Sequence, residues 1–313
     1  MTGERAGATA LGPAAGGDRA EPVFLLATAR SYSTVTIAML SRHPRIFGFP
    51  ELQIFRVPRV ADLLAAPTRE ASQPPWHYLG EWERTGIYRA LAQVHEAIQD
   101  PPAISRARSW LERHAQWPME HLMDHLLGEV APSIGLEKSP ATLGYENGLQ
   151  RCLAAYPRAR FIHLVRHPAA AQNSMHEYWR ERFPTDLRAR CAQVWYVGNL
   201  RAAKTLRNLP AERWIRLRAE DLMTRPDDVL PAVLGWLGLD ASADLVGEMK
   251  HPERWEFAGR GQDGSLGGGD AKFLRRSELR PIRLPGPVEF DSSWEVSRPF
   301  FDRIKLLATY FGY

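Results

Sequence analysis

Two stretches of the sequence place basic and hydroxyl side chains where an apolar run gives way to polar residues. The first is ATARSYST at residues 27–34, which follows the apolar run PVFLL. A helix predicted to begin near Ser33 would aim its backbone N–H groups and positive dipole end at this loop, an arrangement that favours phosphate. Arg30 adds a cationic fork, and the hydroxyls of Ser31, Ser33 and Thr34 add hydrogen bonds. The loop therefore indicates an anion site, although its Ser and Thr residues are equally consistent with simple helix caps.

The second stretch is LVRHPAAAQNS, in which Arg166 ends an apolar run and Ser174 follows eight residues later. A cation at the end of a strand and a hydroxyl about two turns into the next helix can hold one phosphate from two sides. Taken separately, each residue is more commonly solvated at the surface.

A parallel sheet would bring both stretches to one edge. Residues 22–28 and the run RFIHLV read as buried parallel strands, and SIGLEKSP and RWIRLRAEDL as further strands. Helices are predicted over residues 33–42 and 142–156 and directly after Arg166. This alternation predicts an α/β, P-loop-like three-layer fold with a central parallel sheet flanked by helices, which binds ligands at the carboxyl ends of its strands. The usual phosphate-loop pattern G-x-x-x-x-G-K-[ST] is absent.

The chain reads as one domain over residues 21–313, preceded by a disordered Ala/Gly-rich tail at residues 1–20. Residues 52–130 are predicted as a largely helical insertion on the acceptor side, with two helices between residues 88 and 128. Proline and glycine mark residues 67–86 as loop.

The composition of the chain argues against several classes of protein. The 313 residues are 44% hydrophobic, and their net charge of +4 is mild and dispersed, which favours small anionic ligands and argues against nucleic acid. The two cysteines, Cys152 and Cys191, form no metal or disulfide pattern. The sequence contains no apolar run of about 18 residues that would predict a membrane span and no signal-peptide core. We therefore expect a cytoplasmic protein.

The ordered motifs resemble the sulfotransferases that use 3′-phosphoadenosine 5′-phosphosulfate (PAPS). In that family a strand–loop–helix of the form P-R-S-G-T-T binds the 5′-phosphosulfate, and ARSYST at residues 29–34 is similar. The family's 3′-phosphate site is an arginine at a strand end with a serine eight residues later, which is the spacing of Arg166 and Ser174. The segments FPEL, LEKSP, RLRAEDLMTRP and the terminal YFGY also resemble the family, and FPEL and GGGDAKF are similar to segments of bacterial sulfotransferase domains of polyketide and related natural-product assembly.

The resemblance implies transfer of a sulfuryl group from PAPS to a hydroxyl of a natural product, sugar or lipid, with 3′,5′-ADP as the other product. Arg30 would then stabilise the leaving group, Glu51 would act as general base and Lys138 would stabilise the transferring sulfonate. The nucleotide would contact the remaining candidates: Ser31, Tyr32, Ser33, Thr34, Arg166, Ser174, Gly268, Gly269 and Lys272. As alternatives, Glu51 and Lys138 would be solvated side chains and GGGDAKF a flexible linker.

Two positions depart from the family pattern. Tyr32 stands where the family has glycine, and Ala29 where it has proline. Because glycine lets backbone approach phosphate closely, we expect Tyr32 to have a negative φ and a ring directed away from the phosphate, onto the nucleotide or the acceptor.

The sequence alone is also consistent with other functions. A non-catalytic relative could keep the nucleotide pocket, and a P-loop small-molecule kinase would have to work without the phosphate-loop lysine. The basic run at residues 275–283 is typical of a solvated edge, and it could also receive an anionic acceptor or a carrier protein. Trp195 could stack on adenine but is more typical of a core. His121 and His125 lack a third ligand, so no metal is expected.

Overall fold

The computed structural model describes residues 21–65, 81–145, 147–181, 186–261 and 267–313. The tail predicted at residues 1–20 lies outside the described residues, as does most of the loop predicted at residues 67–86.

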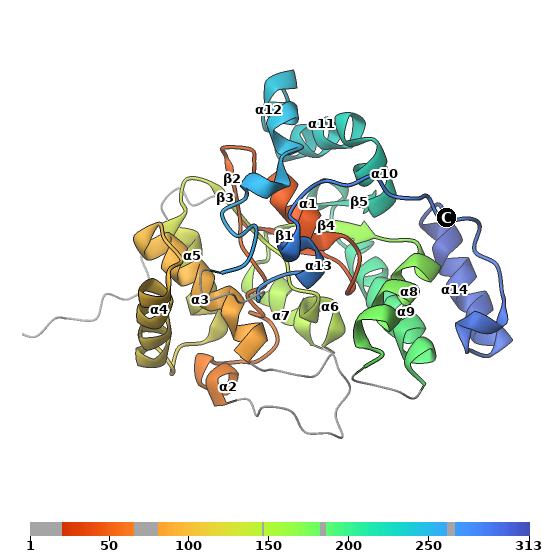
Figure 1. The fold of residues 1–313 in the computed structure, drawn as a ribbon, viewed down its shortest axis with the longest axis horizontal. Helices are drawn as coiled ribbons and strands as arrows, with labels where there is room; N and C mark the ends of the chain where they lie inside the picture. Colours follow the sequence, from red (N-terminus) through yellow and green to blue (C-terminus); the bar gives the residue numbers. More distant parts are fainter. Residues whose placement is uncertain (1–20, 66–80, 146, 182–185, 262–266) are drawn as a thin grey trace, which may run out of the picture.

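Five parallel strands form one sheet in the order β2-β3-β1-β4-β5 (Figure 1). The strands are β1 Val23–Leu26, β2 Ile46–Gly48, β3 Ile134–Glu137, β4 Arg160–Val165 and β5 Trp214–Arg218. The chain passes from β1 to the edge strand β2, returns to β3 beside β1, and then continues on the other side of β1 through β4 and β5. The loop after β1 is therefore at the topological switch point, where parallel α/β sheets bind ligands.

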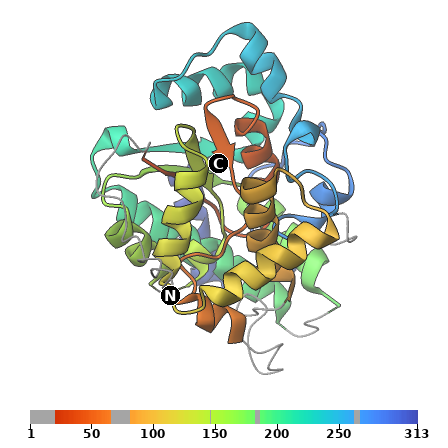
Figure 2. The same ribbon diagram turned by 90° about the vertical axis from the view of Figure 1, so that its left-hand side faces the viewer.

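Helices cover both faces of the sheet (Figures 1 and 2). They are α1 Ser33–Leu40, α2 Val60–Ala65, α3 Glu81–Glu96, α4 Pro101–Arg113, α5 Met119–Glu129, α6 Ala141–Gly144, α7 Gly148–Ala155, α8 Pro168–Trp179, α9 Leu187–Leu206, α10 Ala219–Thr224, α11 Pro226–Leu237, α12 Ala243–Met249, α13 Ala271–Arg275 and α14 Arg298–Tyr310. In the part of the chain that the structure describes, none of them has the length and apolar character of a transmembrane span.

The alternation of side chains along β1 explains the three layers. Phe24 and Leu26 belong to a core shared with α3, α5 and α7, whereas Val23 and Leu25 belong to a second core shared with α1, α11 and α12. A third core joins α8, α9 and α14 beyond β4. The predicted three-layer α/β fold with a parallel central sheet is confirmed.

The helical segmentation differs from the prediction in two places. Between residues 81 and 129 the chain forms three helices, not two, and residues 81–86 are helical rather than loop. Gly86 made this start look like loop, but a Cβ there would come within 2.1 Å of the Glu51 carbonyl oxygen, so the glycine serves close packing. The helix predicted over residues 142–156 forms as α6 and α7.

Candidate active site

The two predicted anion-binding stretches meet at the carboxyl ends of neighbouring strands. Arg30 follows β1 and Arg166 follows β4, the strand paired with it. The Arg30 Nε donates to the Ser174 hydroxyl at 3.2 Å, and the Arg166 Nη1 donates to the backbone carbonyl of Arg30 at 2.7 Å. Residues 144 and 136 positions apart in the chain thus form one cluster.

The loop after β1 has an unusual backbone. Arg30 has φ 63° and Tyr32 has φ 61°, both in the left-handed region, where a non-glycine residue is strained by about 1–2 kcal/mol. The expected negative φ at Tyr32 is therefore wrong: the tyrosine keeps a conformation that glycine would adopt freely. Its carbonyl accepts from both the backbone N–H and the hydroxyl of Thr36, at 3.0 Å each, which fixes the turn to the first turn of α1.

The Tyr32 ring lies against Arg166. The guanidinium carbon of Arg166 is 4.1 Å from the ring centroid, and its Nη2 donates to the phenolic oxygen at 3.1 Å. A cation over an aromatic face is attracted by the quadrupole of the ring. This contact compensates the strained backbone and explains why the ring turns toward Arg166.

Arg166 is a partly buried cation with an unused donor. Its Nε is buried without a hydrogen-bond partner, and no carboxylate of the described residues forms an ion pair with it. Burial lowers the pKa of its guanidinium. The Trp195 indole donates to its carbonyl at 2.8 Å, and the Tyr313 hydroxyl donates to the adjacent Val165 carbonyl at 2.9 Å. A cation held firmly with a donor free is suited to an anion from outside the chain.

A second part of the site centres on Lys138, directly after β3. The Lys138 Nζ lies 2.5 Å from Glu51 Oε1 and donates to the Thr34 hydroxyl at 3.0 Å. The Lys138 side chain is 1% exposed and that of Glu51 is 21% exposed. A lysine buried this deeply needs a counter-ion, and the pairing leaves the Glu51 carboxylate at the solvent edge.

The glycine-rich segment at residues 267–270 closes the cluster. The Glu51 N–H donates to the Gly268 carbonyl at 2.8 Å, and the Asp270 N–H donates to the Thr34 hydroxyl at 2.9 Å. Gly268 has φ 86°, and a Cβ on Gly269 would approach Thr34 Cγ2 to 3.0 Å, so both positions favour glycine. The Asp270 carboxylate forms a short ion pair with Arg30 and also caps α13.

The structure therefore brings most of the predicted site residues into one cluster, and two point elsewhere. Ser31 is fully buried and its hydroxyl lies 3.1 Å from that of Thr28. Lys272 is exposed and pairs with Glu177 on α8 at 2.6 Å. Those in or against the cluster are Arg30, Tyr32, Ser33, Thr34, Glu51, Lys138, Arg166, Ser174, Gly268 and Gly269.

Sequence reasoning missed three residues of the site: Asp270, Tyr178 and Glu137. The Arg30 guanidinium carbon lies 5.0 Å from the Tyr178 ring centroid. Tyr178 could have been predicted from the sequence, because it lies one turn after Ser174 on α8 and so lies on the same face of that helix. Asp270 directly follows the quoted glycines, and Glu137 directly precedes Lys138. Nothing local to either carboxylate marks it as part of a site.

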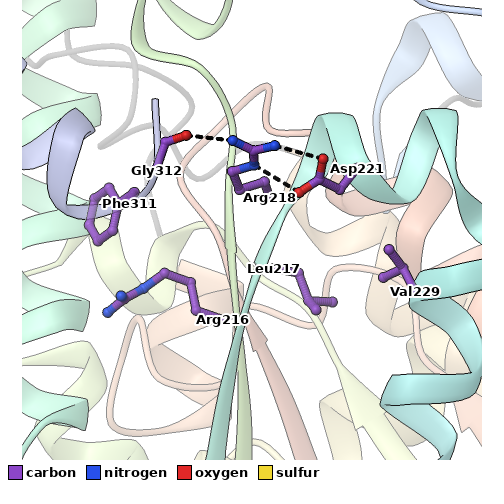
Figure 3. Close-up of a pocket in the computed structure, with 7 residues that line it drawn as sticks. All are labelled: Arg216, Leu217, Arg218, Asp221, Val229, Phe311 and Gly312. Carbon is purple, nitrogen blue, oxygen red and sulfur yellow. Dashed lines mark hydrogen bonds and ion pairs between the residues drawn. The ribbon is translucent and has the colours of Figure 1, made fainter.

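Trp195 is fully buried, with its indole bonded to the Arg166 backbone, as expected of a core residue. A pocket of about 360 Å³ lies at the outer edge of β5, where Figure 3 shows Arg216 and Leu217 on opposite sides of the strand. Its Arg218 already donates to Asp221 at 2.8 Å and to the Gly312 carbonyl. No predicted site residue lines this pocket, and the described residues contain no group of three or more side chains suited to a metal.

The sequence of this chain matches a known protein family. A profile described as the sulfotransferase family matches residues 22–243, well over half of the chain. The chain belongs to the sulfotransferase family. No curated protein matches its sequence.

Two solved structures share the fold of this sulfotransferase. The sulfotransferase domain from the curacin biosynthetic pathway superposes with a TM-score of 0.73 at 20% identity, covering 94% of this chain and 98% of that one. The sulfotransferase domain of the Synechococcus PCC 7002 olefin synthase gives a TM-score of 0.69 at 21% identity, covering 97% and 99%.

Proposed function

We propose that this sulfotransferase moves a sulfuryl group from PAPS to a hydroxyl of a small-molecule acceptor. The observation that carries the proposal is the convergence of Arg30, Ser174 and Arg166, two cations and a hydroxyl from separate strand ends, on one cluster. A nucleotide that carries two separate phosphate groups is a ligand that two such cations can bind.

The residues present fit such a nucleotide. Arg166 has a buried Nε without a partner, and the Tyr32 hydroxyl beside it can donate a further hydrogen bond. These two groups with Ser174 would hold the 3′-phosphate. Arg30, Thr34 and the first backbone N–H groups of α1 would hold the 5′-phosphosulfate. When bound, PAPS supplies an activated sulfuryl group on a good leaving phosphate.

Glu51 and Lys138 would serve the transfer itself. Glu51 carries the carboxylate at the solvent edge of the site, where an acceptor hydroxyl can reach it, and would take the acceptor proton as the new O–S bond forms. Lys138, held between Glu51 and Thr34, places a fixed positive charge where negative charge has to be stabilised. Arg30 would neutralise the departing phosphate oxygen.

The acceptor side would be formed by the helices between β2 and β3. Gly86 of α3 packs on the backbone of Glu51 and Gly268, which places this helix next to the proposed base. One structural neighbour is a sulfotransferase domain from a biosynthetic pathway and the other is that of an olefin synthase. This favours a natural-product hydroxyl, free or attached to a carrier protein, as the acceptor.

Calorimetric titration with 3′,5′-ADP tests the donor site, and transfer of labelled sulfate from PAPS to a panel of alcohols tests the reaction. We expect the wild-type protein to bind 3′,5′-ADP without magnesium. The Glu51→Gln variant should bind 3′,5′-ADP equally well, but its turnover should be about 10²–10⁴-fold lower. Glu112→Gln, on the exposed side of α4, is the matched control.

Three outcomes would reject parts of this function. Stabilisation by ATP with magnesium, and none by 3′,5′-ADP, would indicate a kinase. Binding of ADP without transfer to any alcohol would indicate a non-catalytic relative. Full activity of Glu51→Gln would remove Glu51 from the role of base.

A further inference from the structure

A second carboxylate lies beneath the proposed base. Glu137 is the last residue of β3, directly before Lys138, and is 1% exposed. Burying a carboxylate costs free energy unless the group is hydrogen-bonded, paired with a cation or protonated. The role proposed above for Glu51 leaves this one without a function.

Glu137 holds the turn that carries Glu51. Its carboxylate accepts the backbone N–H of Leu52 and, in a short hydrogen bond, the hydroxyl of Ser139. The Ser139 oxygen in turn accepts the backbone N–H of Gln53 at 2.9 Å. Gln53 has φ 59°, a strained conformation for a non-glycine residue. The two residues after Glu51 are therefore anchored to Glu137, one directly and one through a single hydroxyl.

Three titratable groups face Glu137 from the elements around it. They are Lys138 in the same segment, Glu51 in the turn, and Cys152 on α7, whose thiol is fully buried. Lys138 thus pairs directly with Glu51 and interacts electrostatically with Glu137. Burial, the largest effect, raises the pKa of Glu137 to about 7, while the bonds from Ser139 and Leu52 and the charge of Lys138 oppose it.

We propose that Glu137 is a positioning residue for the transfer reaction: it fixes the Glu51 turn and, when ionised, shares the charge of Lys138 with Glu51. When Glu137 is neutral, Glu51 alone neutralises the charge of Lys138 and is held as its counter-ion. With Glu137 ionised, that hold weakens and Glu51 is freer to accept the acceptor proton. The proposal rests on the proposed function, since it assigns Glu137 a task in the same reaction.

The consequence is a pH dependence with a defined origin. Ionisation of Glu137 accompanies the rise in pH through about 7, so turnover should increase over that range. Charges that interact in a partly buried site can change a rate about tenfold. A purely structural clamp would give no such increase.

Glu137→Gln tests this, because glutamine keeps the shape and the acceptor oxygen but cannot ionise. We expect 3′,5′-ADP affinity to stay within about threefold and turnover to match the wild type at pH 6. At pH 8 turnover should be about tenfold lower, with the rise through pH 7 lost. Glu120→Gln on α5, whose carboxylate pairs with Arg151 on α7, should keep the rise.

An infrared measurement gives a readout independent of activity. The carbonyl band of a protonated carboxylic acid should be present at pH 6, disappear by pH 8, and be missing in Glu137→Gln. If the band behaves so but the variant keeps the kinetic rise, or loses turnover equally at both pH values, the positioning role is wrong while the proposed function stands. A wild-type protein that binds ADP but transfers no sulfate would instead reject the proposed function.

Ser139→Ala provides a second variant in case Glu137→Gln does not fold. It removes the hydroxyl that links Glu137 to Gln53 but leaves the titrating carboxylate in place. We expect turnover above the rise to be about threefold lower, in line with one lost hydrogen bond. The rise should be retained but moved to higher pH, because the Ser139 bond lowers the pKa of Glu137. Unchanged turnover, or a rise that disappears, would contradict the proposed linkage.

Discussion

The Arg30 guanidinium donates from Nε to the hydroxyl of Ser174 across 3.2 Å. This bond joins the loop after β1 to the second turn of α8, and Asp270 and Tyr178 occupy other sides of the same guanidinium. Arg30 is thus held by a hydroxyl, a carboxylate and an aromatic face before any ligand arrives. A group oriented in this way costs little reorganisation when charge develops beside it.

Arg30→Lys should lower kcat/KM for sulfate transfer by about a hundredfold, because an ammonium cannot keep the fork that meets Ser174 and Asp270 together. Steady-state kinetics with saturating acceptor would measure the loss. Arg180→Lys, an exposed position at the end of α8, should have no effect. Equal activity of Arg30→Lys and wild type would exclude a role for the fork.

Tyr32→Phe should weaken 3′,5′-ADP binding by about three- to tenfold, the cost of one hydrogen bond. The ring over Arg166 is kept, so the midpoint of thermal unfolding should change little. Titration calorimetry with both proteins would show the difference. An unchanged dissociation constant would place the phenolic hydroxyl outside the nucleotide site.

Asp270→Asn should strengthen 3′,5′-ADP binding by roughly threefold, since it removes the carboxylate that competes with an incoming anion for Arg30. Asparagine still caps α13, so helix stability is preserved. Asp270→Ala, which loses the cap as well, separates the two effects. Weaker binding by the asparagine variant would indicate that the orientation of Arg30 by the Asp270 carboxylate outweighs any competition with the nucleotide.

Glu137→Gln should change how stability depends on pH. Because burial raises the pKa of Glu137 from 4.5 to about 7, the native state binds more protons than the unfolded chain between those values, and its free energy of unfolding falls as the pH rises through them. Relative to wild type, the glutamine variant should gain about 2–3 kcal/mol between pH 4.5 and 7.5.

Urea unfolding at several pH values would measure this difference. Comparison with the wild type is needed because burial lowers the pKa of His163 to about 3, which gives an opposite slope in both proteins. A constant difference between variant and wild type across the range would contradict the prediction.

The convergence of Arg30 with Ser174 and Arg166 could be predicted because it follows from simple geometry. Residues at the carboxyl ends of paired parallel strands must lie close together, and strand ends are readable from apolar runs. Lys138 after β3 follows from the same rule. Glu51 follows β2 on a segment that continues beside β3, where the Phe49 N–H donates to the Leu136 carbonyl at 2.8 Å.

The remaining features depend on contacts that local sequence does not encode. Tyrosine disfavours a positive φ, and only the contact with Arg166 makes that conformation acceptable at Tyr32. The pairing of Asp270 with Arg30 spans 240 residues and depends on glycines that allow two backbones to meet. In the sequence, Glu137 looks like an ordinary polar residue at the end of a strand. Its side chain is buried in the fold, where it contacts the turn at residues 52 and 53.

The order of the strands has a consequence for how this enzyme could diversify. The three loops that carry Arg30, Lys138 and Arg166 emerge from adjoining central strands, whereas α2, α3, α4 and α5 all belong to one connection between β2 and β3. That connection can lengthen, shorten or be exchanged as a block without moving the strands whose loops form the proposed nucleotide site. A lineage built on this plan can acquire new acceptors through changes in a single stretch of its gene.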